Sequence, residues 1–265
     1  MESNEIRPNL FFCKDCEIIF SEFCDQNFEK NYEDVEDPQY IDQIENKKLY
    51  FNHLIKKISN LIYENDNVLE IGSYYGAFGS QIKNKVKSYE GLELSKYASS
   101  YAINKFNLNI INENLYNFFS KYTKKYDVIF MFDVIEHLDD PDKVLKLCSS
   151  KLNLNGRLIL TTMNMNSLFA RITGKYYQWI IAQHKFYFTN KSMQIFLERN
   201  NLKLNRIIND VRIINIDYFF FKITQKLPFL KFIYKFLDKF EKLKKIKIKF
   251  SLFDINIYCS NLQNK

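Results

Sequence analysis

The fold of this 265-residue chain can be inferred from one stretch, Val68-Leu-Glu-Ile-Gly-Ser-Tyr-Tyr-Gly-Ala-Phe-Gly79. An apolar run leads into Gly72, and Gly76 and Gly79 follow at steps of four and three residues. This order predicts a buried strand, a tight turn and a helix, because glycine lets the backbone turn sharply and lets a ligand approach it. Dinucleotide-binding turns have the spacing G-x-G-x-x-G, so the spacing here argues against a nicotinamide cofactor.

Outward from this turn, short apolar runs alternate with amphipathic stretches, which is typical of βα units and a parallel sheet. We expect strands at 68–72, 89–94, 109–112, 126–132, 157–162, 202–214 and 250–259. We expect helices at 77–86, 96–106, 141–151 and 189–200. The pattern predicts a doubly wound, mostly parallel, seven-stranded α/β sheet.

The length and the 46% of hydrophobic residues suit one large α/β domain with additions. We expect an N-terminal appendage with a cover helix over 1–66, and a core domain over 67–215. A basic helical insertion over 216–250 and a last strand over 251–265 then follow. The cover helix is expected over 40–63, where apolar residues recur at steps of three and four.

The net charge of +7 is concentrated late in the chain. From Asp217 to Phe250 there are ten lysines against three acidic residues, 10 − 3 = +7, so the remainder is neutral. A nucleic-acid partner is therefore not indicated. Phenylalanines alternate with the lysines over 218–250 at helical spacing, which suits an anionic membrane surface, and equally a lid or a face for a second subunit in a homodimer.

Cysteine usage and hydropathy indicate a cytoplasmic protein. The five cysteines are an odd number, and residues 1–9 are too polar for a signal peptide. No stretch approaches the roughly 20 apolar residues that a membrane-spanning helix needs.

Two acidic residues at strand ends point to an adenosyl ligand. Glu70 precedes the first glycine, and Glu93 lies 93 − 72 = 21 residues beyond Gly72, where a carboxylate can accept both hydroxyls of a ribose. The pattern Glu70-x-Gly72-x-Tyr74-x-Gly76 resembles the acid-x-Gly-x-Gly-x-Gly turn of class I S-adenosylmethionine-dependent methyltransferases, with Tyr74 in place of the middle glycine.

The resemblance implies S-adenosylmethionine as cofactor, bound by residues at the strand ends and in the turn. It extends to the loop after the third strand, where adenine is contacted by Asn112, Glu113 or Asn114. The residues expected to bind the cofactor in these regions are Glu70, Gly72, Tyr74, Gly76, Glu93, Leu94 and Asn114.

The most specific match is Asp127-Val-Ile-Phe-Met-Phe-Asp-Val-Ile-Glu-His-Leu-Asp-Asp-Pro141. It is similar to the fourth strand of these methyltransferases and the Glu-His-Leu-x-x-Pro element that follows it. The resemblance implies that Phe132 and Asp133 border the donor and that His137 is a structural or ligand-contacting residue rather than a base.

The region from Asn164 to His184 follows the fifth expected strand, where loops of such sheets cover the ligand crevice. Gln183-His-Lys-Phe-Tyr-Phe-Thr189 resembles a stretch found there in one subgroup of the family. We therefore expect His184 to act as the catalytic base or to contact the acceptor; the alternative is a histidine that anchors the loop.

Cys13-Lys-Asp-Cys16 resembles half of the zinc knuckle that precedes some sugar-modifying methyltransferases. A closed structural zinc site needs four ligands, and only Cys24 is near enough in sequence to join the pair. We expect no metal here.

Taken together, the resemblance implies a cytoplasmic methyltransferase that acts on a small molecule, with a sugar nucleotide or another surface-glycan or lipid-linked precursor as acceptor. Two alternatives stay open. One is an O-methyltransferase for a quinone or lipid precursor, and the other is a non-catalytic module with this fold that binds a membrane or a partner protein.

Overall fold

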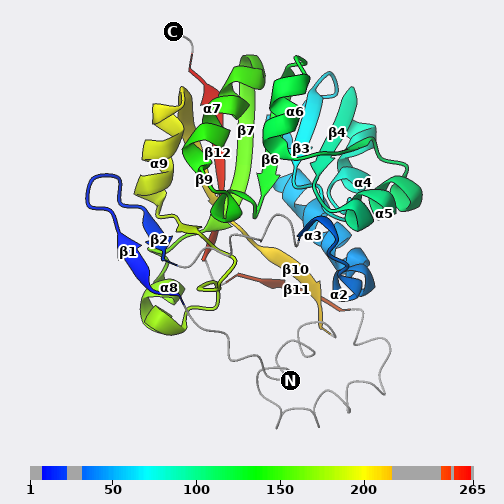
Figure 1. Ribbon diagram of the computed structural model, residues 1–265. Coiled ribbons are helices and arrows are strands. Elements are labelled where there is room, and N and C mark those ends of the chain that lie inside the picture. The colour runs from blue at the N-terminus through cyan, green and yellow to red at the C-terminus, as the bar shows by residue number, and fades with distance from the viewer. Residues whose placement is uncertain (1–7, 23–31, 217–245, 252–253, 264–265) are drawn as a thin grey trace, which may run out of the picture.

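The structure, a computed structural model, describes residues 8–22, 32–216, 246–251 and 254–263 (Figure 1). Its centre is a seven-stranded sheet in the order β5-β4-β3-β6-β7-β12-β9. These strands are β3 (Asn67–Ile71), β4 (Ser88–Glu93), β5 (Ile110–Asn112), β6 (Tyr126–Phe132), β7 (Leu152–Met163), β9 (Leu202–Asn209) and β12 (Ile255–Leu262). Strand β12 runs antiparallel to both neighbours, and the other pairs are parallel. The expected doubly wound, mostly parallel seven-stranded sheet is confirmed.

Helices cover both faces of this sheet (Figure 1). The helices α3 (Ile44–Lys57), α4 (Gly79–Ile82) and α5 (Lys96–Phe106) pack on one face, around Leu54, Phe78 and Ala102. The helices α6 (Leu115–Lys121), α7 (Pro141–Lys151) and α9 (Asn190–Arg199) pack on the other, around Phe118, Val144 and Met193. Strand β6 lies at the centre with both faces buried, as its apolar run predicts.

Side-chain caps explain why two helices have the predicted bounds. Ser95 accepts a hydrogen bond from the amide of Ala98 and starts α5, and Asp140 accepts one from the amide of Lys143 and starts α7. Such caps satisfy amide groups that have no partner within the helix. The expected helices over 96–106 and 141–151 are confirmed.

The helix expected over 40–63 does cover the sheet, as α3, but its bounds and its continuity are wrong. The chain forms α2 (Pro38–Asp42), α3 and a short 3-10 turn, Ser59–Leu61. At Gln43 the backbone leaves the helical conformation, with φ −101° and ψ 10°, and this residue caps α2. The kink turns α2 toward the glycine turn after β3, while α3 still covers the sheet (Figure 1).

The expected strands over 202–214 and 250–259 are also wrong in their bounds. Between β9 and β10 (Arg212–Asn215), Asp210 is buried; its amide donates to the carbonyl of Ile255 and its carboxylate accepts the Tyr50 hydroxyl. After this last contact with β12 the chain leaves the main sheet, and β10 pairs antiparallel with β11 (Lys247–Phe250).

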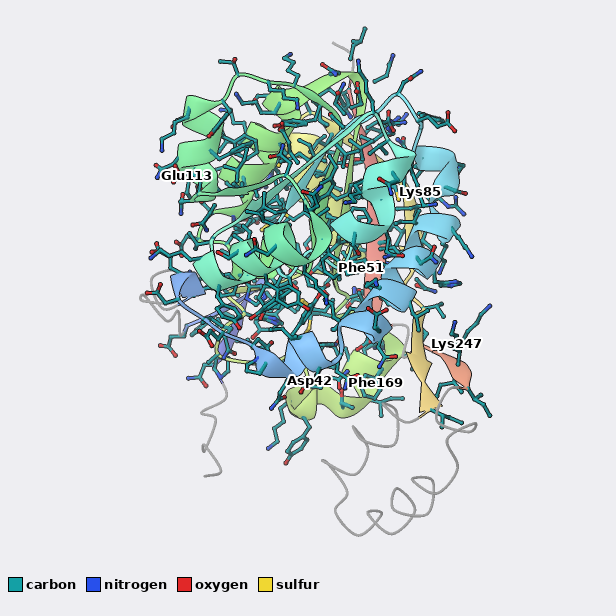
Figure 2. The ribbon with its side chains drawn as sticks, turned by 90° about the vertical axis from the view of Figure 1, so that its right-hand side faces the viewer. Asp42, Phe51, Lys85, Glu113, Phe169 and Lys247 are labelled. Atoms are coloured by element: carbon teal, nitrogen blue, oxygen red, sulfur yellow. The ribbon has the colours of Figure 1, made fainter. Side chains whose placement is uncertain are left out.

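This β10–β11 ribbon extends beside α3, with Lys247 on its outer part (Figure 2). Most of the expected basic insertion, residues 217–245, lies outside the described residues. Every helix that the structure describes is too short or too polar to cross a bilayer.

The N-terminal residues form part of a second, three-stranded sheet. Strands β1 (Leu10–Phe12) and β2 (Ile19–Ser21) are antiparallel, and β2 pairs with β8 (Phe186–Tyr187). Cys13 and Cys16 lie in the turn between β1 and β2, where burial raises the pKa of the Cys16 thiol. Cys24 lies outside the described residues.

Candidate functional site

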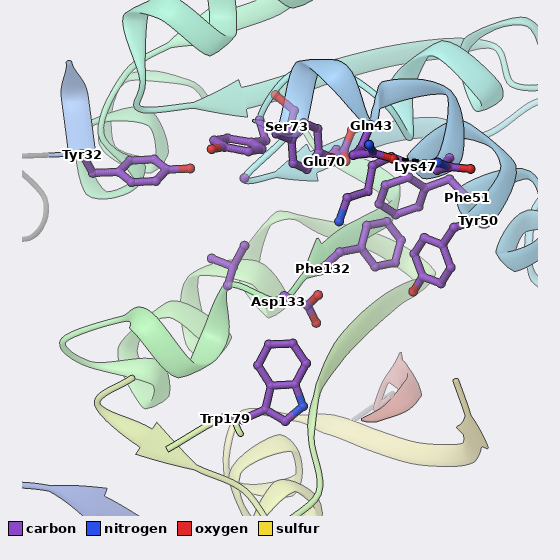
Figure 3. Close-up of a pocket in the computed structure, with 15 residues that line it drawn as sticks. Tyr32, Gln43, Lys47, Tyr50, Phe51, Glu70, Ser73, Phe132, Asp133 and Trp179 are labelled. Carbon is purple, nitrogen blue, oxygen red and sulfur yellow. Dashed lines mark hydrogen bonds between the residues drawn. The ribbon is translucent and has the colours of Figure 1, made fainter. Parts of the chain in front are cut away.

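Two adjoining cavities lie at the carboxyl ends of β3, β4 and β6. The first, about 390 Å³ and here named the α3-side cavity, is bordered by α3, the turn after β3, the end of β6 and Trp179 (Figure 3). The second, about 200 Å³ and named the β4-side cavity, lies between the ends of β4 and β5 and the turn after β6. Tyr32, Gly72, Asp133 and Val134 line both, so the two cavities adjoin along these residues and together form the crevice at the strand ends. Ligands of open α/β sheets bind at this edge.

The turn after β3 has the backbone conformation that its glycines predict. Gly72 has φ +74°, and a Cβ added there would lie 2.5 Å from a methyl carbon of Val134. Tyr74 takes φ +46°, a conformation that is costly for a non-glycine residue. Its ring meets Tyr40 edge-on at 4.6 Å, and its hydroxyl donates to Asp37 at 3.0 Å, which helps to hold the departure from the glycine pattern in place.

Glu70 lies on the floor of the α3-side cavity and is 3% exposed. It accepts a hydrogen bond from the Tyr89 hydroxyl. Burial raises its pKa well above the ordinary range. The carboxyl group is therefore tied to the core by Tyr89 while its residue borders the cavity.

Glu93 ends β4 in the β4-side cavity and is 2% exposed. Its carboxylate accepts the amide of Tyr74 at 2.7 Å and the amide of Ser95 at 2.8 Å. Burial raises the pKa of Glu93 to about 7, against the effect of these backbone hydrogen bonds and one from the Tyr32 side chain. The structure thus brings Glu70, Gly72, Tyr74 and Glu93 together.

The β4-side cavity also contains the expected residues Leu94, Asn114 and His137. Apolar side chains of Leu92, Leu115 and Leu138 line it as well, which suits a flat ring. The Asn114 side chain accepts a hydrogen bond from the amide of Tyr116 at 2.9 Å and caps α6. This residue therefore stabilises the start of a helix in addition to any contact with a ligand. Gly76 lines neither cavity; its positive φ of +76° shapes the turn.

Phe132 and Asp133 lie at the junction expected for them. The Phe132 ring is 4.7 Å from Phe78 and forms part of the cavity wall. Asp133 has φ +53°, and its carboxylate accepts the Thr161 hydroxyl at 2.8 Å. Figure 3 shows this carboxylate directed into the space between Phe132 and Trp179.

His184 is 4% exposed and lines neither cavity. Its Nδ1 lies 2.8 Å from the carbonyl oxygen of Trp179 and, because a carbonyl only accepts, carries the hydrogen. Burial, together with His137, lowers the pKa of His184 to about 3. Its observed contact is with the loop that carries Trp179.

One group of metal-ligand type is found among the described residues: Glu136, His137 and His184, whose ligand atoms lie within 4.8 Å of one another. Glu136 is buried and accepts the Thr162 hydroxyl at 3.1 Å. Burial raises the pKa of Glu136 well above its ordinary range. The group could offer one carboxylate oxygen and two imidazole nitrogens to a divalent cation.

Several cavity residues escaped the sequence analysis, among them Tyr32, Lys47 and Trp179. Figure 3 shows the Lys47 side chain extending from α3 toward Phe132 and Asp133. A signal existed, because Gln43, Lys47 and Tyr50 recur at the spacing of one helix face and all are polar or amphipathic. Trp179 lies in the loop over 164–184 that the sequence analysis expects to cover the crevice, although the residue itself is not singled out there, whereas Tyr32 lies in a segment without periodicity that only the tertiary structure brings there.

Comparisons with known proteins agree with this geometry. A family model described as a methyltransferase domain matches residues 43–206, more than half of the chain. A SAM-dependent methyltransferase of Archaeoglobus fulgidus superposes with a TM-score of 0.56 at 16% identity, covering 85% of this chain and all of that one. Magnesium protoporphyrin IX methyltransferase of Synechocystis, solved with bound SAH, gives 0.52 at 13% identity, covering 89% and 93%.

Sequence relatives include ubiquinone biosynthesis O-methyltransferases. Those of Yersinia pestis and Yersinia enterocolitica are each 25% identical, over 127 and 89 residues, or 45% and 34% of this chain. The chain spans 50% and 36% of their lengths, so it matches half or less of each relative. The matched domain, the sheet order and the crevice at the strand ends together lead to one conclusion. The chain belongs to the methyltransferase-domain family and has the fold of SAM-dependent methyltransferases.

Proposed function

We propose that this enzyme transfers a methyl group from S-adenosylmethionine to a small molecule. The observation that carries the proposal is the pair of adjoining cavities at the strand ends, with Gly72 and Asp133 in the wall of both and Glu93 in the smaller one. The β4-side cavity suits adenine and ribose, and the α3-side cavity suits the methionine part and the acceptor. When bound, the donor supplies a methyl group on a positively charged sulfur.

Lys47 supports the placement of the methionine part. It is the one cation among the described residues that line the α3-side cavity, and it suits a carboxylate. The neighbouring Asn46 has a buried Oδ1 with no hydrogen-bond partner in the described part of the chain, and such an oxygen can accept from an ammonium group. Lys47 is thus available to the carboxylate of the methionine part, and Asn46 to its ammonium group.

The acceptor would enter beside Trp179. Aromatic residues of the α3-side cavity, Phe51, Phe132 and Trp179, provide an apolar wall that excludes water and suits a ring. Asp133, held by Thr161, can accept the proton of an acceptor hydroxyl. His184, expected as the catalytic base or an acceptor contact, lines neither cavity, and its part in catalysis is proposed instead as that of a positioning residue, because its Nδ1 donates to the Trp179 carbonyl.

Two acceptor classes follow. A sugar nucleotide or another surface-glycan precursor is supported by the Cys13-x-x-Cys16 start and the His184 stretch, which the structure joins through the pairing of β2 with β8. A hydroxylated aromatic ring, as in a quinone precursor, is supported by the partial match to ubiquinone biosynthesis O-methyltransferases and by the aromatic wall.

Binding of S-adenosylhomocysteine tests the donor site. Isothermal titration of the wild-type chain should give saturable 1:1 binding, and Lys47→Met should weaken it about tenfold or more through loss of a charge-assisted contact. Methylthioadenosine, which lacks the amino-acid part, should bind both proteins equally. Failure of the wild type to bind S-adenosylhomocysteine would favour a non-catalytic module with this fold.

Transfer of a labelled methyl group to two probe acceptors, a UDP-sugar and 3,4-dihydroxybenzoate, separates the acceptor classes. Methylation of the catechol alone would support the aromatic class, and methylation of the UDP-sugar alone the glycan class. Donor binding without transfer to either probe would be consistent with a methyltransferase, but it would exclude the UDP-sugar and 3,4-dihydroxybenzoate as acceptors.

We further propose a cytoplasmic enzyme that contacts anionic membranes through residues 218–250, with no nucleic-acid partner. The charge of the sequence from Asp217 to Phe250, 10 − 3 = +7, supports this contact. Co-flotation with vesicles containing phosphatidylserine should occur and should weaken as salt increases. Elution as a dimer in gel filtration would instead support the use of this segment in a homodimer.

A further inference from the structure

The helix α8 (Leu168–Thr173) and the 3-10 turn that follows it present large apolar side chains to solvent. Leu168 is 71% exposed, Ile172 74% and Tyr176 68%. Leu168 and Ile172 are four residues apart and share one side of the helix, Tyr176 follows after another four, and Phe169 packs inward. A single exposed apolar side chain is common at a protein surface, but three on one short segment are typical of an interaction surface.

The formal charges of this segment are positive. Arg171 and Lys175 alternate with the three apolar side chains and are exposed, and the sequence has no Asp or Glu between Asp142 and Glu198. Apolar side chains interleaved with arginine and lysine suit the surface of an anionic membrane, where the apolar groups enter the acyl boundary and the cations meet the lipid phosphates. The surface here named the outer side of α8 consists of Leu168, Arg171, Ile172, Lys175 and Tyr176.

The outer side of α8 belongs to the end of the molecule at which the crevice lies. Figures 1 and 2 show α8 beyond the carboxyl ends of the strands, at the same end as the β10–β11 ribbon with its exposed Lys247 and Lys249. Helix α2, which carries the acidic Asp42, lies on the opposite side of this end (Figure 1). Trp179, in the wall of the α3-side cavity, comes only three residues after Tyr176. A surface bound by α8 would therefore lie close to this cavity.

We propose that the outer side of α8 docks on the surface of an anionic bilayer. This contact differs from the one proposed for residues 218–250, because α8 places apolar side chains within the interface and lies in the described part of the chain. Docking brings the proposed acceptor entrance beside Trp179 to the bilayer, so that a lipid-linked acceptor reaches it from the membrane. That consequence rests on the proposed function, whereas the docking itself does not.

A tryptophan placed on α8 reports this contact directly. In Ile172→Trp, fluorescence should be quenched by vesicles of phosphatidylserine and brominated phosphatidylcholine more strongly than in the wild type, whose only tryptophan is Trp179. Leu154→Trp is the matched control, because Leu154 is 75% exposed but lies near the start of β7, about 30 Å of strand away from α8. Its quenching should equal that of the wild type.

Removal of the apolar side chains tests their contribution to binding. The double variant Leu168→Ser with Ile172→Ser should lower the partition coefficient onto the same vesicles about tenfold or more, because two side chains no longer enter the interface. Leu154→Ser should leave the partition coefficient unchanged. Both variants should keep the wild-type affinity for S-adenosylhomocysteine, since none of these residues lines either cavity.

Wild-type quenching in Ile172→Trp, or an unchanged partition coefficient in the double variant, overturns the docking of α8 and leaves the contact through residues 218–250 standing. Absence of vesicle binding by the wild type overturns both membrane contacts, while the titration with S-adenosylhomocysteine still decides the methyltransferase proposal. A wild-type dimer in gel filtration that the double variant converts to a monomer would overturn the docking on lipid and assign the outer side of α8 to a second copy of the chain.

Discussion

At the scale of single residues, the crevice depends on two carboxyl groups whose environments differ. The Glu70 carboxyl group accepts a hydrogen bond from the Tyr89 hydroxyl inside the core, whereas the Glu93 carboxylate accepts hydrogen bonds from backbone amides at the edge of the cavity. Both are buried, so both pKa values are raised, but amide hydrogen bonds favour the ionised form of Glu93 and limit its shift. Glu93 is therefore the acid that can change its charge near neutral pH.

This difference predicts a pH dependence of donor binding. The pKa of Glu93 is about 7, so the group is mostly protonated at pH 6 and mostly ionised at pH 8. Ribose hydroxyls donate to the ionised form, so the affinity for S-adenosylhomocysteine should rise as the pH rises from 6 to 8, by up to about tenfold. Titrations at both pH values check this.

Glu93→Gln, which cannot ionise, should bind more weakly and should lose this part of the pH dependence. A wild-type affinity that is flat from pH 6 to pH 8, or an unchanged slope in the variant, would contradict the assignment of the titration to Glu93.

The glycine turn gives a second prediction at this scale. Gly72→Ala places a methyl group 2.5 Å from a side-chain carbon of Val134 at a φ of +74°, so it combines a clash with a costly backbone conformation. We expect the free energy of unfolding to fall by about 2–4 kcal/mol in urea denaturation. Gly174→Ala is the control, since its φ is +50° but nothing lies within 4 Å of the added carbon.

The control should lose only the backbone part, about 1–3 kcal/mol at φ +50° and ψ −125°, and so less than Gly72→Ala. Equal losses in the two variants would mean that packing against Val134 does not constrain Gly72.

At the scale of elements, hydrogen bonds of the loop before β8 fix Trp179 in the wall of the α3-side cavity. The indole donates to Asp254 at 3.0 Å, and the Trp179 carbonyl binds His184 at 2.8 Å. Strand β8 in turn pairs with β2, so the N-terminal hairpin braces the same loop. Three segments far apart in the chain thus determine where one cavity-lining side chain lies.

His184→Ala should therefore cut turnover with the acceptor that the transfer assay identifies, by about tenfold or more, while the affinity for S-adenosylhomocysteine stays within about twofold. The reason is geometric: Trp179 loses an anchor, whereas the β4-side cavity keeps its lining. His53→Ala, at a half-buried position on α3, is the control for removing an imidazole. Unchanged turnover in His184→Ala would exclude His184 from catalysis, as base or as positioning residue.

At the scale of the whole molecule, a buried ion pair links the two halves of the sheet. Arg157 in β7 lies 2.6 Å from Asp66, just before β3, and both side chains are 10% exposed or less. Removing one partner leaves an uncompensated buried charge, so Arg157→Met should lower the free energy of unfolding by about 3–5 kcal/mol in urea denaturation.

The double change Asp66→Asn with Arg157→Met should recover part of that loss. The exposed pair Lys48–Glu45, 2.9 Å apart on α3, is the comparison, and Lys48→Met should cost less than about 1 kcal/mol. If Arg157→Met lowered the free energy of unfolding by as little as Lys48→Met does, water would have to reach the Arg157–Asp66 pair.

The local part of the fold followed from the sequence because it depends on neighbours in the chain. Gly72 and Gly76 have positive φ, which glycine adopts at little cost. Ser95 and Asp140 cap the helices that begin at the next residue. The apolar run of β6 is stable when both of its faces are buried at the centre of the sheet. The ends of β3 and β4 then meet at one edge in any parallel sheet, which brings Glu70 and Glu93 to a common crevice.

The tertiary structure alone decided what depends on distant partners. The chain leaves the main sheet after Asp210, whose carboxylate accepts the hydroxyl of Tyr50, 160 residues away in the sequence. His184 lines neither cavity; its Nδ1 donates to the Trp179 carbonyl, and the Trp179 indole donates to Asp254. Tyr32 borders both cavities because α2 ends at Gln43 and the segment before it lies over the glycine turn. Hydrogen bonds between groups far apart in the chain leave no period in the sequence, and these bonds complete the site.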